Sequence, residues 1–131
     1  MSIRLRAGFE DFISGLPATS IVRQWGDASV AKVGEKVFAL LGFDEPEGRP
    51  ALVFKVTEFT FDMLTELDGV GQAPYFAKRG WVRVAAGAEL SDGDLEAYVV
   101  EAHRLVAAKL TRKLQAELGL SELIAAGPRR S

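Results

Sequence analysis

The feature that most constrains the fold is a run of three β-type segments joined by two short turns, between residues 19 and 43. Apolar and β-branched residues fill the segments, and Gly26-Asp27 and Gly34-Glu35 separate them. A glycine followed by a polar residue suits the tight primed turns of β-hairpins, because such turns need positive φ angles. The run therefore predicts a three-stranded meander, which commits the domain to an antiparallel sheet.

The rest of the chain adds two strands and three helices. The order α-β-β-β-β-α-β-α indicates an α+β fold of two layers, in which a five-stranded antiparallel sheet carries its helices on one face. The last helix drifts in its apolar pattern, so we expect it to bend, break or end near Thr111. The further strands are predicted over 51–56 and 81–84, and the helices over 5–15, 58–67 and from 91 onward.

Length and composition indicate one soluble domain. The chain has 131 residues, of which 48% are hydrophobic and 26% charged, as in average globular proteins. A chain of this length buries enough surface to fold without metal or disulfide. We predict a single domain over residues 1–120 and a flexible tail over 121–131. The loop at 44–50, with two prolines and three acids, should be solvated.

The absence of cysteine and the single histidine, His103, exclude several kinds of site. They rule out disulfide frameworks, thiol nucleophiles and metal centres built on several cysteines or histidines. We therefore expect no metal and no cofactor. The N-terminal segment lacks a signal-type apolar run, and no stretch approaches the ~20 apolar residues of a membrane span, so we predict a cytoplasmic protein without membrane contact.

One motif in the second half of the chain resembles a motif of a known protein family. The stretch Ala73 to Val84, APYFAKRGWVRV, is similar to a motif of MmcQ/YjbR-like proteins, in which Pro-Tyr, Lys-Arg and Trp precede a strand. Further likenesses are WGD at 25–27, AKVGEKVFALL at 31–41 and AHRLVAAKL at 102–110. The resemblance spans about residues 9–118. It implies a double-wing α/β fold, also likened to secretion-chaperone-like folds, and a role in DNA binding.

Basic and aromatic residues are the candidates for contacts with nucleic acid, because phosphates attract cations and bases stack on rings. Some lie together in the family-like phrase, and others lie beside a hairpin turn, within an apolar strand or in the acid-free segment 103–116. In the alternative interpretation, the aromatic rings fill the edge of the core and the charged groups are merely solvated. The candidates are Lys36, Lys55, Tyr75, Lys78, Arg79, Trp81, Arg112 and Lys113.

These observations predict a non-enzymatic module that binds DNA weakly and mainly through charge. The sequence pI of about 5.5 means that any such surface is local. A protein- or peptide-interaction domain of the chaperone type, and a small-molecule-binding domain, stay open as alternatives. Glycine-rich nucleotide motifs and nucleophile motifs are absent from the sequence. A deep pocket that held Trp25, Lys55 and Tyr75 together would favour an enzyme instead.

Overall fold

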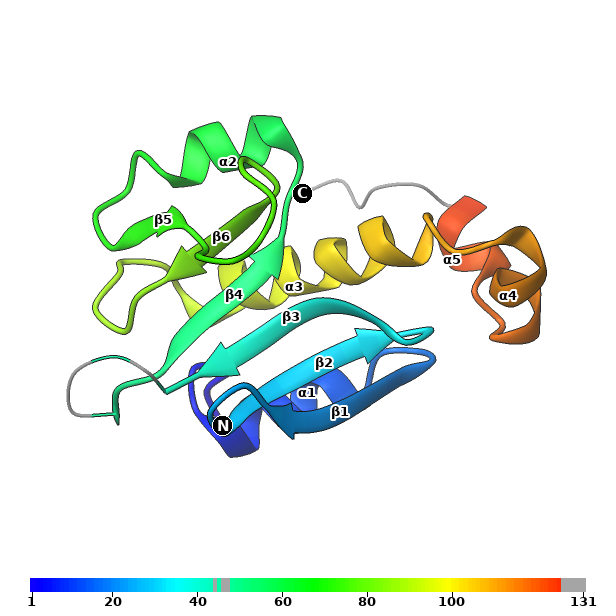
Figure 1. Cartoon of the computed structure of the whole chain (residues 1–131), viewed down its shortest axis with the longest axis horizontal. Coiled ribbons are helices and arrows are strands. Elements are labelled where there is room, and N and C mark those ends of the chain that lie inside the picture. Colours follow the sequence, from blue (N-terminus) through cyan, green and yellow to red (C-terminus); the bar gives the residue numbers. More distant parts are fainter. Residues whose placement is uncertain (44, 46–47, 126–131) are drawn as a thin grey trace.

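An antiparallel sheet of six strands, in the order β1-β2-β3-β4-β6-β5, forms the centre of the protein (Figure 1). The computed structural model describes residues 1–43, 45 and 48–125. The strands are β1 (Thr19–Gln24), β2 (Ala28–Val33), β3 (Lys36–Gly42), β4 (Ala51–Lys55), β5 (Val70–Gln72) and β6 (Trp81–Val84).

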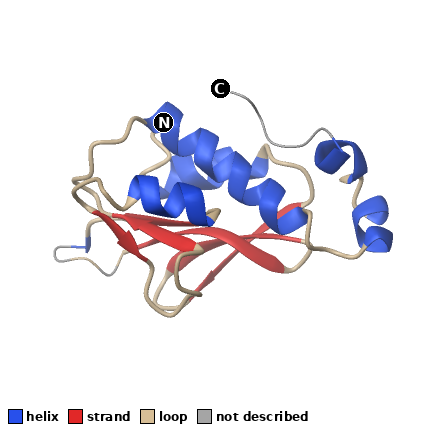
Figure 2. Ribbon diagram, turned by 90° about the horizontal axis from the view of Figure 1, so that it is seen from above, coloured by secondary structure: helices blue, strands red, loops and turns tan. Residues whose placement is uncertain are grey.

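The helices lie on one side of this sheet, which gives the two-layer arrangement that the element order predicts (Figure 2). The longest helix, α3, runs along β3 and β4, and α1 packs beside β1 and β2. The helices are α1 (Arg6–Ser14), α2 (Glu58–Leu64), α3 (Asp92–Ala107), α4 (Arg112–Glu117) and α5 (Ser121–Ala125).

The two turns of the meander form close to where the sequence places them. Val33 pairs with Lys36, so Gly34 and Glu35 make a two-residue turn, with φ angles of 54° and 72°. The first turn is one residue longer than predicted, because Gln24 pairs with Ala28 and leaves Trp25 outside the strand. Trp25 itself takes a φ of 54° and is 59% exposed.

The prediction of five strands is wrong, because the sheet has a sixth. The segment from Val70 to Gln72, expected to be loop, pairs with the outer side of β6 as β5. Three residues are too few to show an alternating pattern in a sequence. They become a strand because the backbone groups of β6 would otherwise lack partners on that side.

A change of direction after α3 confirms the predicted break near Thr111. The Thr111 hydroxyl begins α4 by accepting a hydrogen bond from the Leu114 N–H at 3.2 Å. The side-chain amide of Gln115 donates to the Ala107 and Leu110 carbonyls at 3.2 and 2.9 Å. These bonds satisfy carbonyls that the end of α3 leaves free.

The segment after Leu120 begins as a helix. Residues Ser121–Ala125 form α5, whose Leu123 and Ile124 pack against the core, whereas the sequence predicts a flexible tail from residue 121. The remainder of that predicted tail, residues 126–131, lies outside the described residues.

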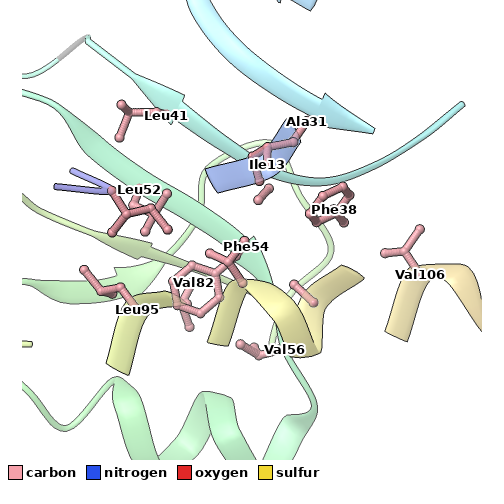
Figure 3. Packing of buried hydrophobic residues seen from close by; sticks show 14 of the residues in the cluster. Ile13, Ala31, Phe38, Leu41, Leu52, Phe54, Val56, Val82, Leu95 and Val106 are labelled. Atoms are coloured by element: carbon pink, nitrogen blue, oxygen red, sulfur yellow. The ribbon is translucent and has the colours of Figure 1, made fainter. Parts of the chain in front are cut away.

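The main core fills the space between the helices and the sheet. Figure 3 shows Phe54 and Val82 from the sheet close to Leu95 of α3. Phe38 and Leu41 of β3 belong to the same cluster and are fully buried. Along β4 this face alternates with the opposite face, as the pleat requires, whereas an irregularity in the pairing of β2 with β3 interrupts the alternation in β3.

The opposite, helix-free face carries a second apolar cluster. In a two-layer fold this face of an antiparallel sheet is ordinarily polar and solvated, so an apolar cluster there needs an explanation. Its members are Ala28, Val30, Leu40, Val53, Ala73 and Trp81, with Val37 and Phe76 packed against them.

His103 is a structural residue of the main core. It is 1% exposed, and its Nε2 lies 2.8 Å from the Pro17 carbonyl oxygen. Because a carbonyl only accepts, the neutral ring donates from Nε2. The ring also meets Phe38 edge-on, with centroids 5.2 Å apart. Burial lowers the pKa of His103, although the bond to Pro17 acts in the opposite direction.

Candidate nucleic-acid interface

The loop formed by residues 73–80 lies over the helix-free face and is held in place by Gln72. The Gln72 amide nitrogen donates to the Ala73 carbonyl at 2.7 Å, and its oxygen accepts the Arg79 backbone N–H at 2.9 Å. At the far end of the loop, the Gly80 carbonyl accepts a hydrogen bond from the Val56 N–H at 2.9 Å. Loop 73–80 is thereby fixed to β5 and to the end of β4, the two strands that flank β6.

Three aromatic rings meet beneath this loop. Phe76 stacks on Trp81, with ring centroids 4.4 Å apart, and meets Trp25 edge-on at 6.3 Å. Tyr75, next to Phe76, is fully exposed and takes a φ of 70°. The loop therefore contributes one aromatic ring to the second cluster and holds another in solvent.

A cavity of about 460 Å³ opens between loop 73–80, the turn at Trp25 and the sheet; we term it the aromatic cavity. Its volume lies within the usual range for small-ligand sites, and most of its wall is apolar. It is lined by Trp25, Gly26, Ala28, Leu40, Gly42, Phe43, Ala51, Val53, Pro74, Tyr75, Phe76 and Arg83.

Arg83 brings charge to the wall of the aromatic cavity and is paired with Glu45. Its guanidinium lies 3.1 Å from Glu45 Oε2, and the Glu45 side chain is only 7% exposed. Arg49 approaches the other carboxylate oxygen at 3.6 Å. The sequence predicts a solvated loop at 44–50, so the burial of this carboxylate corrects that expectation at Glu45; residues 44, 46 and 47 lie outside the described residues.

A second cavity, of about 320 Å³, lies where β4 ends against loop 73–80 and the last turn of α3. Four cationic side chains surround it, and we term it the lysine cavity. It is lined by Lys55, Val56, Thr57, Glu58, Ala77, Lys78, Arg79, Gly80, Leu105 and Lys109.

The charges of the lysine cavity are only partly balanced. Arg79 donates to Asp62 at 2.8 Å and lies 3.9 Å from Glu58, so its charge is met by α2. Across residues 1–43, 45 and 48–125, Lys55, Lys78 and Lys109 take part in no ion pair. The cavity thus presents uncompensated positive charge, which favours an anionic ligand.

Lys55 lies partly buried in the wall of the lysine cavity. Burial lowers its pKa, and the charge of Lys109 lowers it further. Gly80 makes room for the ammonium group, since a Cβ there would lie 2.9 Å from Lys55 Nζ. An anion in the cavity would relieve the repulsion between the two lysines and replace lost solvation.

Trp81 connects the two cavities without lining either. It pairs with Lys55 across β4 and β6, and Lys55 Nζ lies 5.8 Å from the centre of its ring. The same ring carries the stacked Phe76 of the aromatic cavity. Only 9% of Trp81 is exposed, so it serves as the floor between the two sites.

The structure brings five of the eight predicted candidates together. Lys55, Lys78 and Arg79 line the lysine cavity, and Tyr75 lines the aromatic cavity. Trp81 lies between them as described.

Three further candidates line neither cavity. Lys36 lies beside the turn at Gly34, and Arg112 and Lys113 lie on α4. All three are exposed. A Cβ at Gly34 would lie 2.6 Å from a methyl carbon of Leu110, which shows that the hairpin tip packs against the segment leading into α4.

The combination that would favour an enzyme does not form. Trp25 and Tyr75 share the aromatic cavity, but Lys55 lines the lysine cavity. Among the described residues, no group of three acidic or histidine side chains could hold a metal ion. In the same part of the chain, no helix is long and apolar enough to cross a membrane.

Sequence reasoning missed several residues of the site. Lys109 belongs to the acid-free segment 103–116, but the sequence does not show that the end of α3 meets the end of β4. Trp25 belongs to the WGD motif at 25–27. A prediction of a three-residue turn there, rather than a two-residue turn, would have placed Trp25 outside the strand. Phe76 and Arg83 lie within the motif at 73–84, but their roles depend on the packing of loop 73–80 and on Glu45, which the sequence does not show.

Comparison with known proteins identifies the family of this chain and structures that share its fold. The family model described as YjbR matches residues 14–105. The chain belongs to the YjbR family. A crystal structure of a YjbR-like Deinococcus radiodurans protein, with the domain DUF419, has a TM-score of 0.79 at 19% sequence identity. The match covers 98% of this chain and 97% of the Deinococcus chain.

A second solved structure of the same fold comes from Pseudomonas syringae. It has a TM-score of 0.63 at 18% identity and covers 77% of this chain and 97% of its own. At these identities the two structures show that the YjbR fold is shared. A search of curated proteins finds no match.

Proposed function

We propose that this YjbR-family protein is a non-enzymatic module that binds nucleic acid through the phosphate groups of the strand. The observation that carries the proposal is the lysine cavity, where Lys55, Lys78 and Lys109 converge with no ion-pair partner among the described residues. Lysine ammonium groups are strong ligands of phosphate oxygens, and the release of counterions makes such binding favourable.

The position of the lysine cavity supports the proposal that its ligand is a nucleic-acid strand. The cavity adjoins loop 73–80, on which Lys78 and the exposed Tyr75 are three residues apart. Basic grooves with neighbouring aromatic rings are typical of proteins that follow a single strand. Arg79 contributes less than its charge suggests, because Asp62 and Glu58 already meet its guanidinium.

Fluorescence anisotropy tests the proposal directly. Labelled duplex and single-stranded DNA would be titrated with protein at about 50 and 150 mM salt, since phosphate binding weakens steeply with salt. The variant with Lys78→Gln and Lys109→Gln should bind more weakly and lower the salt slope by about 0.7 for each lost contact on a single strand.

A matched variant on α4 locates the site. The change of Arg112→Gln and Lys113→Gln removes the same charge from the other predicted basic segment. The proposal expects a smaller effect there than in the lysine cavity. Equal or larger weakening by the α4 variant would contradict the placement, and a lack of binding by the unmodified protein at low salt would overturn the proposed function.

The structure also favours a second candidate, a domain that binds an extended peptide. Val22 on the edge strand β1 is exposed, and Trp25 in the turn after β1 lines the aromatic cavity, which suits an apolar side chain. A peptide can add to such an edge by backbone hydrogen bonds while a pocket selects a side chain. Saturable binding of apolar peptides that is indifferent to salt, together with no binding of DNA, would support this candidate.

A further inference from the structure

Two aromatic residues at the mouth of the aromatic cavity are held in a costly conformation. Trp25 and Tyr75 have φ angles of 54° and 70°, a region that residues other than glycine, asparagine and aspartate rarely adopt. Trp25 is 59% exposed and Tyr75 is fully exposed, so neither recovers that cost through burial. Exposed, strained aromatic rings beside a cavity point to a ligand that completes their packing.

The walls of the cavity suit a planar ring with a polar edge. Trp25 and Phe76 present aromatic surfaces in edge-to-face contact, and Leu40 and Val53 lie on the strands beneath. Arg83 contributes guanidinium N–H donors, and its ion pair with the buried Glu45 fixes its position. Arginine donors match the ring nitrogen and carbonyl acceptors of nucleobases, whose faces stack on aromatic side chains.

The neighbouring lysine cavity supplies what the rest of a nucleotide requires. The Phe76 ring of the aromatic cavity lies 4.4 Å and Lys55 Nζ of the lysine cavity lies 5.8 Å from the centre of the Trp81 ring, so both sites border the same indole. Every nucleotide of a strand carries one phosphate and one base. On a strand that crosses loop 73–80, a phosphate near Lys55 and Lys78 is therefore accompanied by a base that can enter the neighbouring aromatic cavity.

We infer that the aromatic cavity binds an unpaired nucleobase of the strand whose phosphate occupies the lysine cavity, an inference that rests on the proposed function. Trp25 and Tyr75 stack against the base, and Arg83 donates to its edge. Because the bases of a duplex are paired and stacked inside the helix, this arrangement selects single-stranded nucleic acid. The aromatic contacts are tolerant of sequence, since every base has a stacking face.

Two oligomers with the same number of phosphates, one with bases and one without, distinguish the binding of a base from the binding of the backbone. Oligothymidylate of about 16 nucleotides and an abasic oligomer of equal length would be compared by anisotropy at low salt, as this length spans a typical single-strand site. The unmodified protein should bind oligothymidylate about tenfold more tightly than the abasic strand, the gain expected when one base stacks. Tyr75→Ala and Trp25→Ala should reduce that ratio to less than about threefold while affinity for the abasic strand stays unchanged.

A matched variant and a check of folding distinguish the loss of the base contact from the loss of the folded structure. Tyr75→Phe retains the ring and should keep the preference, and thermal melting checks that each variant is folded. Equal binding of both oligomers by the unmodified protein, or an unchanged ratio in Tyr75→Ala and Trp25→Ala, would overturn the inference and leave the proposed function standing. Absence of binding to both oligomers would overturn the proposed function, and the inference with it.

Discussion

The two faces of the sheet differ in what covers them. The helix-covered face is closed by α1 and α3, and its phenylalanines, such as Phe38 and Phe54, are fully buried. The helix-free face is covered by loop 73–80 and one hairpin turn, which leave a cavity lined by exposed rings. The comparison teaches that apolar residues on the first face are buried and stabilise the fold, whereas those at the rim of the second stay exposed, as the proposed ligand site requires.

The largest expected effect comes from emptying the helix-covered face. Phe54 packs against Tyr98 of α3, with ring centroids 5.9 Å apart, and is fully buried. Phe54→Ala should lower the free energy of unfolding by about 3–5 kcal/mol, because it leaves a cavity that the core cannot close. Urea denaturation measures this loss. A loss below about 1 kcal/mol would remove the distinction between the two faces.

The next largest loss of stability is expected from replacing the arginine that holds the segment leading into α3. The Arg4 guanidinium donates to four carbonyls, those of Ala85, Ala86, Ala88 and Leu90, at 2.7 to 3.4 Å. Arg4→Ala should cost about 2 kcal/mol, as expected for hydrogen bonds from a charged group. Thermal unfolding would show the loss. Arg4→Lys should recover only part of it, because an ammonium group cannot span four acceptors; full recovery would contradict this role.

A smaller effect follows from the buried histidine. Burial lowers the pKa of His103 in the folded protein below its ordinary value of about 6.5, so the unfolded chain binds more protons between those two values. Stability is therefore complete above about pH 6.5 and falls as the pH drops toward the folded pKa. Urea denaturation across this range should show less pH dependence in His103→Gln. An identical pH profile in both proteins would contradict the assignment.

The smallest effect belongs to the rim of the helix-free face. Tyr75 is fully exposed with a φ of 70°, so Tyr75→Ala should change the free energy of unfolding by less than about 0.5 kcal/mol. Tyr75→Gly should be at least as stable as Tyr75→Ala, because glycine adopts positive φ without strain. Urea denaturation measures both. A large loss in Tyr75→Ala would show that the ring stabilises the fold and would contradict its assignment to a ligand.

The sequence predicted the elements whose signals are local. The Gly34-Glu35 turn, the helix predicted from residue 91 onward and the break near Thr111 depend on residues within a few positions of one another, and the structure has all three. The strand β5 was missed because its three residues form a strand only where β6 offers a free edge.

The site could be predicted only in part for the same reason. The phrase at 73–84 marked the correct loop, but not that Lys78 and Tyr75 face separate cavities. Lys109 joins the lysine cavity through the meeting of α3 with β4, and Glu45, in the segment between β3 and β4, meets Arg83 of β6. Such contacts between distant segments leave no periodic trace in a sequence.

The most direct test of the central claim is a titration of ¹⁵N-labelled protein with oligothymidylate, followed by NMR. The chain has two tryptophans, and each indole N–H gives its own signal. The account predicts large shifts for the Trp25 indole and the backbone of residues 73–80, with α1 unchanged. Shifts confined to α4 or to the helix-covered side would contradict the claim that the helix-free face binds the ligand.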